Sequence, residues 1–118
     1  MTPEDFFAGK PVALSLFGHV RRTLDAIGPP STRITKSQIA FRRRRAFAWV
    51  WCPDQYLRGR TAPLVLSVSL PRRDGSPRWK EVVEPAPGWF MHHLELFDPA
   101  EIDGEVSTWL QRAWEAAE

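Results

Sequence analysis

The side chains best suited to chemistry are basic ones, and they concentrate in predicted turns and strand ends. Guanidinium groups bind phosphate through paired hydrogen bonds, and aromatic rings stack on nucleic-acid bases. Trp79 and Trp89 lie in or beside a loop that also carries basic residues. We therefore hypothesise an anion-binding site with stacking by these two rings, whose basic members are Arg42, Arg43, Arg44, Arg45, Arg72, Arg73, Arg78 and Lys80.

The net charge is only +2, but it is unevenly distributed along the chain. Residues 1–80 contain 15 Lys and Arg against 5 Asp and Glu, a net of +10, and residues 81–118 contain 1 against 9, a net of −8. Either the basic part binds an anionic partner, or the acidic part neutralises it within the folded chain. Clustering of the arginines favours binding, and their pairing with Glu101, Asp103 and Glu105 favours neutralisation.

A catalytic alternative rests on His93 and Glu95. Two residues apart on a strand, their side chains project to one side and could form an oriented base, with Lys36 or Asp54 nearby. No nucleophile elbow, phosphate-binding glycine loop or paired-carboxylate motif accompanies them. We therefore assign no catalytic residue and expect a protein that is not an enzyme.

The neighbouring histidines do not suit a metal site. His92 and His93 are adjacent on a predicted strand, so they point to opposite faces, and no third ligand has useful spacing. His92 shares its face with Phe90 and Leu94, which predicts a hydrogen-bonded histidine in the core. We expect neither a metal nor a cofactor.

The four consecutive arginines separate two segments with strand character, Ile39–Phe41 and Phe47–Trp51. Unpaired charges are strongly disfavoured in a core, so the chain must reach solvent between them. We predict a hairpin that turns at Arg43 and Arg44, and one long bent strand is the alternative. The hairpin creates two faces, with Ile39, Phe41, Ala46 and Ala48 on one and Ala40, Phe47, Trp49 and Trp51 on the other.

Helix signals occur near both ends of the chain. Thr2 is suited to cap a short helix, and an apolar stripe predicts a second helix over Pro11–Ile27, ended by Gly28 in a left-handed conformation. Asp98 begins a capping box for a last helix that reaches Ala117. Between the helices we predict strands over 39–41, 47–51, 62–70 and 89–97. The segments 33–37 and 79–83 are candidates for a further strand, the second as a short edge strand within a loop.

These elements predict an α+β fold. We expect an antiparallel sheet of four to five strands packed against N-terminal and C-terminal helices, with residues 1–118 forming a single compact domain. Along Ala62–Leu70, the leucines and Val68 face the core, and Val65, Ser67 and Ser69 form a partly wet face.

Composition also suggests a compartment. No apolar stretch has the length of a membrane span, and the N-terminus lacks the order of a secretory signal, so we expect a cytoplasmic protein without a membrane partner. The single cysteine, Cys52, excludes an intramolecular disulfide and fits a reducing compartment. We predict that it is a partly buried, unreactive residue.

Several runs resemble a known family. TKSQIAFRRRR followed by FAWVW, then APLVLSVSLPRRD, SPRWKEVVEPAPG and MHHLEL before an acidic last helix, are similar to the bacterial domain-of-unknown-function family 5655. The resemblance covers roughly residues 16–117. It implies a stand-alone α+β domain and offers no catalytic residues to transfer.

The sequence thus predicts a non-enzymatic module that binds an anion, either nucleic acid or a phosphorylated small molecule. The alternative is a protein-interaction domain that forms a homodimer. An exposed edge strand and apolar residues on the second sheet face, such as Trp49 or Trp89, would support that alternative.

Overall fold

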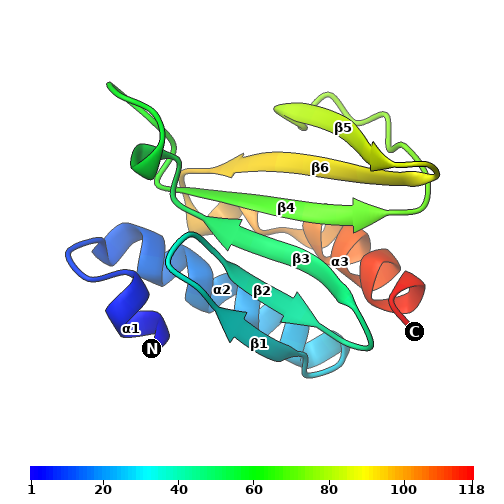
Figure 1. The fold of residues 1–118 in the computed structure, drawn as a ribbon, viewed down its shortest axis with the longest axis horizontal. Helices are drawn as coiled ribbons and strands as arrows, with labels where there is room; N and C mark the ends of the chain where they lie inside the picture. Colours follow the sequence, from blue (N-terminus) through cyan, green and yellow to red (C-terminus); the bar gives the residue numbers. More distant parts are fainter.

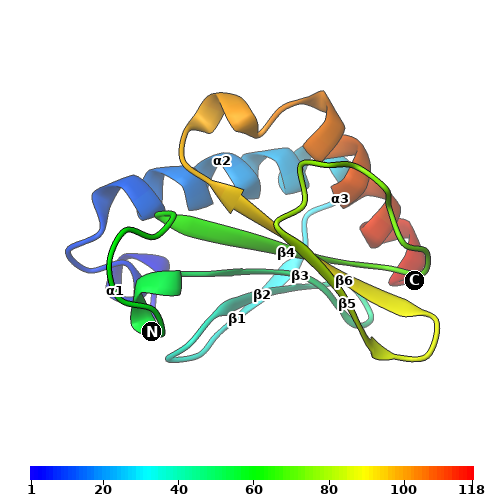
Figure 2. The same cartoon turned by 90° about the horizontal axis from the view of Figure 1, so that it is seen from above.

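Two long helices cover one face of a six-stranded antiparallel sheet and leave the opposite face without a helix (Figures 1 and 2). The structure, a computed structural model, describes all residues, 1–118. The helices are α1 (Pro3–Phe6), α2 (Pro11–Ile27) and α3 (Gly104–Ala116), with 3-10 turns η1 (Pro53–Gln55) and η2 (Pro99–Glu101). None of the helices is both long enough and apolar enough to cross a lipid bilayer.

The strands follow the order β1-β2-β3-β4-β6-β5 across the sheet. Their bounds are β1 (Ser31–Ile34), β2 (Ile39–Arg42), β3 (Ala46–Trp51), β4 (Leu64–Leu70), β5 (Glu81–Ala86) and β6 (Trp89–Leu96). β6 therefore lies between β4 and β5, and the loop that leads to β5 passes around the end of the sheet (Figure 1). The α+β class is confirmed, with six strands instead of four to five.

The first strand differs from its predicted position. It spans Ser31–Ile34 and not 33–37, because the segment Thr35–Gln38 forms a tight turn. The hydroxyl of Thr35 holds this turn by accepting the N–H groups of Ser37 and Gln38. Hydroxyl residues commonly satisfy turn backbone in this way, and the turn lets β1 and β2 pair directly.

β2 and β3 pair as antiparallel neighbours, and residues 43–45 connect them. The register shifts between Phe41, opposite Ala48, and Arg42, opposite Ala46, so Phe47 is an extra residue on β3. Such a bulge redirects a side chain. Phe47 is buried in the core against Trp114, although simple alternation predicts it on the same face as Trp49.

Helix α2 has the predicted bounds, but it ends for a different reason. Gly28 has a φ of 178°, which is extended backbone and not the predicted left-handed conformation. A Cβ atom at this position would lie 2.4 Å from Cζ2 of Trp114. Glycine is therefore required by the close approach of α3.

The C-terminal helix also departs from the prediction. Asp98 and Glu101 form the expected capping box, but it starts only the turn η2. Helix α3 begins at Gly104 with a second cap, in which the Asp103 carboxylate accepts the N–H of Val106 at 3.1 Å. Asp103 is itself an effective N-cap, so two starts occur within six residues.

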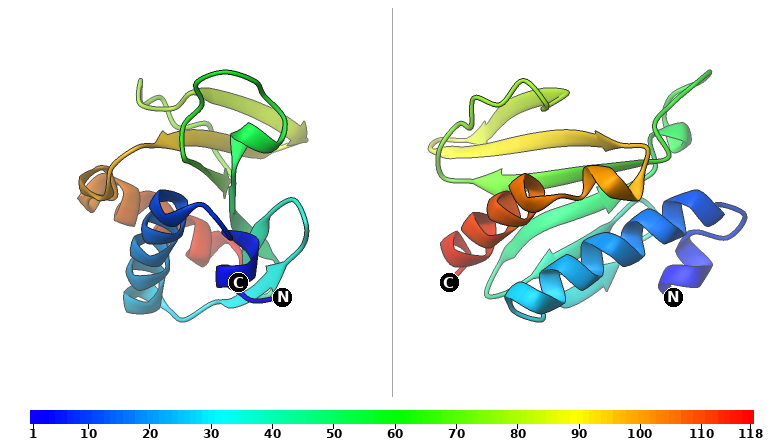
Figure 3. Two further views of the ribbon diagram at one scale, coloured as in Figure 1. Left: turned by 90° about the vertical axis from the view of Figure 1, so that its left-hand side faces the viewer. Right: turned by 180° about the vertical axis from the view of Figure 1, so that it is seen from behind.

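One hydrophobic core lies between the helices and the sheet (Figure 3). Most of its 25 buried residues come from the three helices and from strands β2, β3, β4 and β6. The Cα radius of gyration is 13.4 Å, close to the roughly 13.5 Å typical of a compact domain of this length. The site described next lies outside this core, on the helix-free face.

Candidate ligand-binding site

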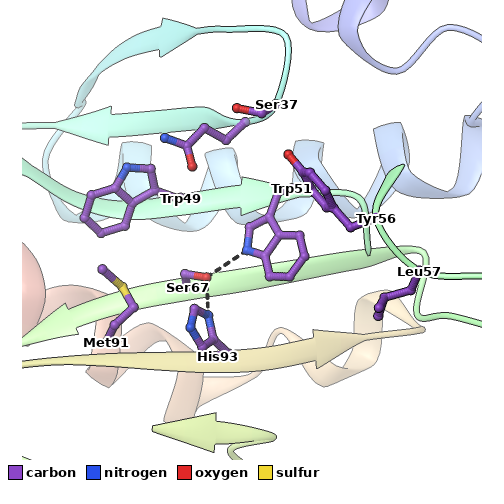
Figure 4. Close-up of a pocket in the computed structure, with 9 residues that line it drawn as sticks. Ser37, Trp49, Trp51, Tyr56, Leu57, Ser67, Met91 and His93 are labelled. Atoms are coloured by element: carbon purple, nitrogen blue, oxygen red, sulfur yellow. Dashed lines mark hydrogen bonds between the residues drawn. The ribbon is translucent and has the colours of Figure 1, made fainter. Parts of the chain in front are cut away.

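A cavity of about 630 Å³ opens on the helix-free face of the sheet. Strands β3, β4 and β6 supply its floor, and the turn before β2 and the loop after η1 supply its rim (Figure 4). Drug-sized ligands typically occupy cavities of about 300–1,000 Å³. Its lining residues are Ser37, Gln38, Trp49, Trp51, Tyr56, Leu57, Ser67, Met91 and His93.

Strand pairing explains why three of these residues meet. Trp49 lies opposite Ser67, and Ser67 lies opposite His93, so they form one row across β3, β4 and β6. Because paired residues point to the same face, an indole, a hydroxyl and an imidazole all project away from the helices. Ser67 is only 3% exposed, since the larger side chains on either side cover it. The predicted partly wet face of β4 is therefore buried.

Ser67 connects Trp51 and His93 through hydrogen bonds. The indole N–H of Trp51 donates to Oγ of Ser67 at 2.9 Å, and this Oγ lies 2.7 Å from Nδ1 of His93 (Figure 4). Because Oγ already accepts from Trp51, we assign its own proton to the hydrogen bond with Nδ1. The proton of the neutral imidazole then resides on Nε2, which has no hydrogen-bond partner within the chain.

His93 is held in its neutral form. Burial lowers the pKa of its imidazole, and the nearby Glu81 carboxylate only partly opposes this effect. Glu81 lies opposite His93 on β5. The cavity thus contains a fixed, uncharged N–H donor at Nε2 of His93 at neutral pH.

Aromatic rings form the walls of the cavity. Trp51 contacts Tyr56 and His93 edge to face, with centroids 6.1 Å apart in both pairs. Tyr56 and Leu57 are largely exposed although they are apolar, and both face the cavity. An ion pair between Lys10 Nζ and Asp54 Oδ1, at 2.7 Å, fastens the preceding turn η1 to the start of α2.

The helix-free face is basic on its β1–β2 side. Arg33 on β1 lies opposite Ala40, which lies opposite Trp49, so the guanidinium belongs to the same row as the cavity floor. Arg42 shares this face by strand alternation, and Lys36 lies in the turn that carries Ser37. None of the three has a carboxylate within 4.0 Å.

The structure distributes the predicted arginine run among different roles. The Arg43 guanidinium donates to the carbonyl of Trp114 at 3.1 Å and lies over the Trp114 indole ring. The backbone N–H of Arg44 donates to the carbonyl of Ala117. Both interactions satisfy backbone at the negative end of α3. Arg45 lies over the ring of Trp89, 3.7 Å from its centroid.

Arg78 and Lys80 are paired with carboxylates. Arg78 binds Asp103 and Glu105 at 3.1 and 2.8 Å, and it also donates to the carbonyl of Glu101. Lys80 lies 3.7 Å from Glu95. For these two residues the acidic C-terminal part provides the neutralisation considered above.

The two predicted stacking residues differ in accessibility. Trp79 is 8% exposed, packs against Trp109 and His92, and donates its N–H to Asp74 at 2.8 Å. A ring enclosed in this way cannot stack on a ligand. Trp89 is the first residue of β6 and lies on the helix-free face, but Arg45 covers one side of its ring.

Three residues of the catalytic alternative have partners other than one another. Nδ1 of His93 hydrogen-bonds Ser67, Glu95 pairs with Lys80, and Asp54 pairs with Lys10. No group of three or more His, Cys, Asp and Glu side chains is arranged to hold a metal ion. Cys52 is fully buried, which raises the pKa of its thiol and disfavours the reactive thiolate.

Reasoning from the sequence did not identify Ser67, Tyr56 or Gln38 as site residues, and it treated Trp49 and Trp51 as packing or interface residues. The signal in the sequence was strand alternation, which puts Trp49 and Trp51 on the same face of one strand and Ser67 on the non-core face of another. Their convergence with His93 depends on the strand order, which alternation alone does not reveal.

Comparison with known proteins identifies a family. The model of the family described as domain of unknown function (DUF5655) matches residues 3–117. No curated protein and no solved structure shows significant similarity to the chain. The chemistry of the site must therefore be argued from its own geometry.

Proposed function

Since the chain belongs to the DUF5655 family, whose description assigns no activity, we propose a function from the cavity itself: the domain binds a nucleotide-like ligand on the helix-free face of its sheet. Such a ligand combines a planar heterocycle with an anionic group. The observation that carries the proposal is the 630 Å³ cavity walled by Trp49, Trp51 and Tyr56.

The walls suit a planar ring. Base–aromatic stacking contributes about 1–3 kcal/mol per base, and antiparallel sheets with exposed aromatic residues recur as binding surfaces for bases. Trp49 and Trp51 are two residues apart on β3 and face the same side, so both present indole surface to the cavity (Figure 4). Met91 adds a polarizable thioether to the floor.

Polar groups in the floor and rim orient the ring. Nε2–H of His93 requires an acceptor, such as a ring nitrogen or an exocyclic carbonyl. The Gln38 amide at the rim offers a donor and an acceptor. A few fixed polar groups within an apolar surface are what small-molecule sites use for specificity.

The basic side of the face suits the anionic group. β1 lies two strands from β3, about 10 Å away, which is a distance that a base with an attached phosphate can span. Arg33 and Arg42 are the guanidinium groups on that side, and neither is neutralised by a carboxylate. This proposal retains part of the predicted arginine run and replaces Trp79 with Trp49 and Trp51 as the stacking residues.

Calorimetric titration with nucleosides and their monophosphates tests the proposal. The Trp49→Ala variant should bind about 5- to 150-fold more weakly, because it removes one stacking surface. Phe97→Ala is the matched control, since Phe97 is an exposed aromatic residue that does not line the cavity. Arg33→Gln should weaken monophosphate binding and leave nucleoside binding unchanged.

Two results would contradict the proposal. One is the absence of saturable binding for every base tested. The other is an equal loss of affinity in Trp49→Ala and Phe97→Ala, which would show that binding does not involve the cavity.

A further inference from the structure

A second cavity, of about 430 Å³, lies at the end of β4 on the helix side of the sheet. Its walls are the last residue of β4, the segment that follows it and one residue of α3. The lining residues are Leu70, Pro71, Arg72, Arg73, Asp74 and Arg112. Three cationic side chains therefore surround one carboxylate, and only one lining residue is strongly apolar.

The single carboxylate already has partners. Oδ2 of Asp74 accepts the indole N–H of Trp79 at 2.8 Å and the N–H of Ser76 at 3.1 Å, and Oδ1 lies 4.0 Å from Arg112. Burial alone would raise the pKa of Asp74, but the hydrogen bonds from Trp79, Ser76 and Trp109, together with His92, outweigh it and hold the pKa below its ordinary value. The Asp74 carboxylate thus holds the loop in place. Neither Arg72 nor Arg73 has a carboxylate within 4.0 Å.

The backbone that carries the arginines is anchored on both sides. Leu70 is buried in the core, and the N–H of Asp74 donates to Nε2 of buried His92 at 2.9 Å. Only three residues separate these two anchors. The backbone of Arg72 and Arg73 therefore starts from a fixed position, which lowers the backbone entropy lost when they bind a ligand.

From this geometry we infer that Arg72, Arg73 and Arg112 form a separate site for a phosphate-class anion, either a diphosphate or a phosphate ester. Guanidinium groups match phosphate oxygens through paired hydrogen bonds. The cavity exceeds the roughly 30 Å³ share of one water molecule many times over, so it has room for more than a single small ion. It lies across the sheet from the aromatic cavity, because Asp74 binds His92 and not His93.

Calorimetric titration of the full chain with pyrophosphate, at low ionic strength, tests this site. Pyrophosphate has no ring, so it does not report stacking in the aromatic cavity, and the Arg33→Gln variant shows whether it binds at the basic side of the helix-free face instead. The double variant Arg72→Gln/Arg73→Gln and the single variant Arg112→Gln should each bind at least about tenfold more weakly. The control Arg21→Gln/Arg58→Gln removes two exposed arginines elsewhere and should retain the wild-type affinity.

A parallel titration with a sugar phosphate distinguishes the two sources of the anion. Tighter binding of pyrophosphate identifies a diphosphate, and tighter binding of the sugar phosphate identifies an ester. The Trp49→Ala variant should bind both as well as the wild type, so failure of this site and failure of the aromatic cavity are separable. Absence of saturable binding, or an equal loss in the Arg21/Arg58 control, would overturn the inference.

Discussion

Ser67 and Ser69 provide a matched pair at the scale of single residues. They lie two positions apart on β4 and on the same face, but only Ser67 makes side-chain hydrogen bonds. We predict that Ser67→Ala lowers the free energy of unfolding by about 1–2 kcal/mol, because the indole N–H of Trp51 and Nδ1 of His93 lose their partner. It should also weaken ligand binding about tenfold, because the His93 tautomer is no longer fixed.

Ser69→Ala is the control for that change, and it should alter the free energy of unfolding by less than about 0.5 kcal/mol. Chemical denaturation of both variants measures the difference. Equal stability of the two variants would contradict the hydrogen-bond assignment at Ser67.

Two histidines of β6, His92 and His93, make the free energy of unfolding depend on pH. Burial lowers the pKa of its imidazole, although hydrogen bonds to the carbonyls of Val68 and Phe90 oppose this, and burial lowers the pKa of His93 as well. Both residues are neutral in the folded and unfolded chains well above pH about 6.5, the ordinary pKa of histidine. Below that pH the unfolded chain binds protons that the folded chain does not, so stability falls as the pH falls.

Denaturation midpoints measured between neutral and mildly acidic pH test this dependence. The His92→Gln variant should be less stable at neutral pH and should lose less stability on acidification, because one of the two shifted groups is gone. A variant profile as steep as that of the wild type would exclude His92 as a cause.

At the scale of the elements, we predict opposite effects for a glycine within α2, Gly18, and the glycine that caps its C-terminus, Gly28. A Cβ at Gly28 would lie 2.4 Å from the Trp114 ring, whereas a Cβ at Gly18 would meet only Nη1 of Arg22, at 3.5 Å. Gly28→Ala should therefore destabilise the fold by about 1–3 kcal/mol by forcing α2 and α3 apart. Gly18→Ala should stabilise it by about 0.5–1 kcal/mol through helix propensity. Thermal unfolding of the two variants checks both signs.

Arg78 connects the loop before β5 to the start of α3. Its guanidinium is largely covered, contacts two carboxylates and a carbonyl, and lies 5.5 Å from the Trp109 ring. We predict that Arg78→Ala costs about 1–3 kcal/mol, because charge-assisted hydrogen bonds are lost together. Lys80→Ala, which breaks one exposed pair at 3.7 Å, should cost less than about 1 kcal/mol.

The same elements show what local sequence predicts well. Helix α2 has its predicted bounds, and β6 ends one residue early, because periodicity over many residues averages out local exceptions. The bulge at Phe47 and the second helix start at Asp103 were not predicted. The bulge depends on a tertiary partner, because Phe47 turns toward Trp114. Asp103, which also binds Arg78, is a local cap that follows closely behind the capping box at Asp98.

At the scale of the whole molecule, the site was less predictable than the fold. The row of Trp49, Ser67 and His93 requires β6 to lie beside β4, and the chain passes through β5 before β6. Local patterns place each residue on a face but do not state which strands are neighbours. The charge asymmetry was informative only in part, because Arg43, Arg78 and Lys80 have structural partners.

The self-association alternative makes a prediction for the whole chain. A dimer through the helix-free face would cover Trp49 and Trp51 and compete with the ligand. The edge strand β5 carries Glu81, Glu84 and Pro85, which disfavour pairing with a second sheet. We therefore expect sedimentation to give a monomer mass at every concentration, and a mass that rises with concentration and falls on ligand addition would favour the dimer.

The central claim is that a planar, anionic ligand binds in the aromatic cavity, and the indole N–H signals in a ¹H–¹⁵N NMR titration test it most directly. The six tryptophans are distributed over both sides of the sheet. With a nucleoside monophosphate, we predict saturable shifts of Trp49 and Trp51 and unchanged signals for Trp79 and Trp109 in the helix-side core. Shifts confined to Trp89 and Trp114, which contact Arg45 and Arg43, or no shifts at all, would contradict the account.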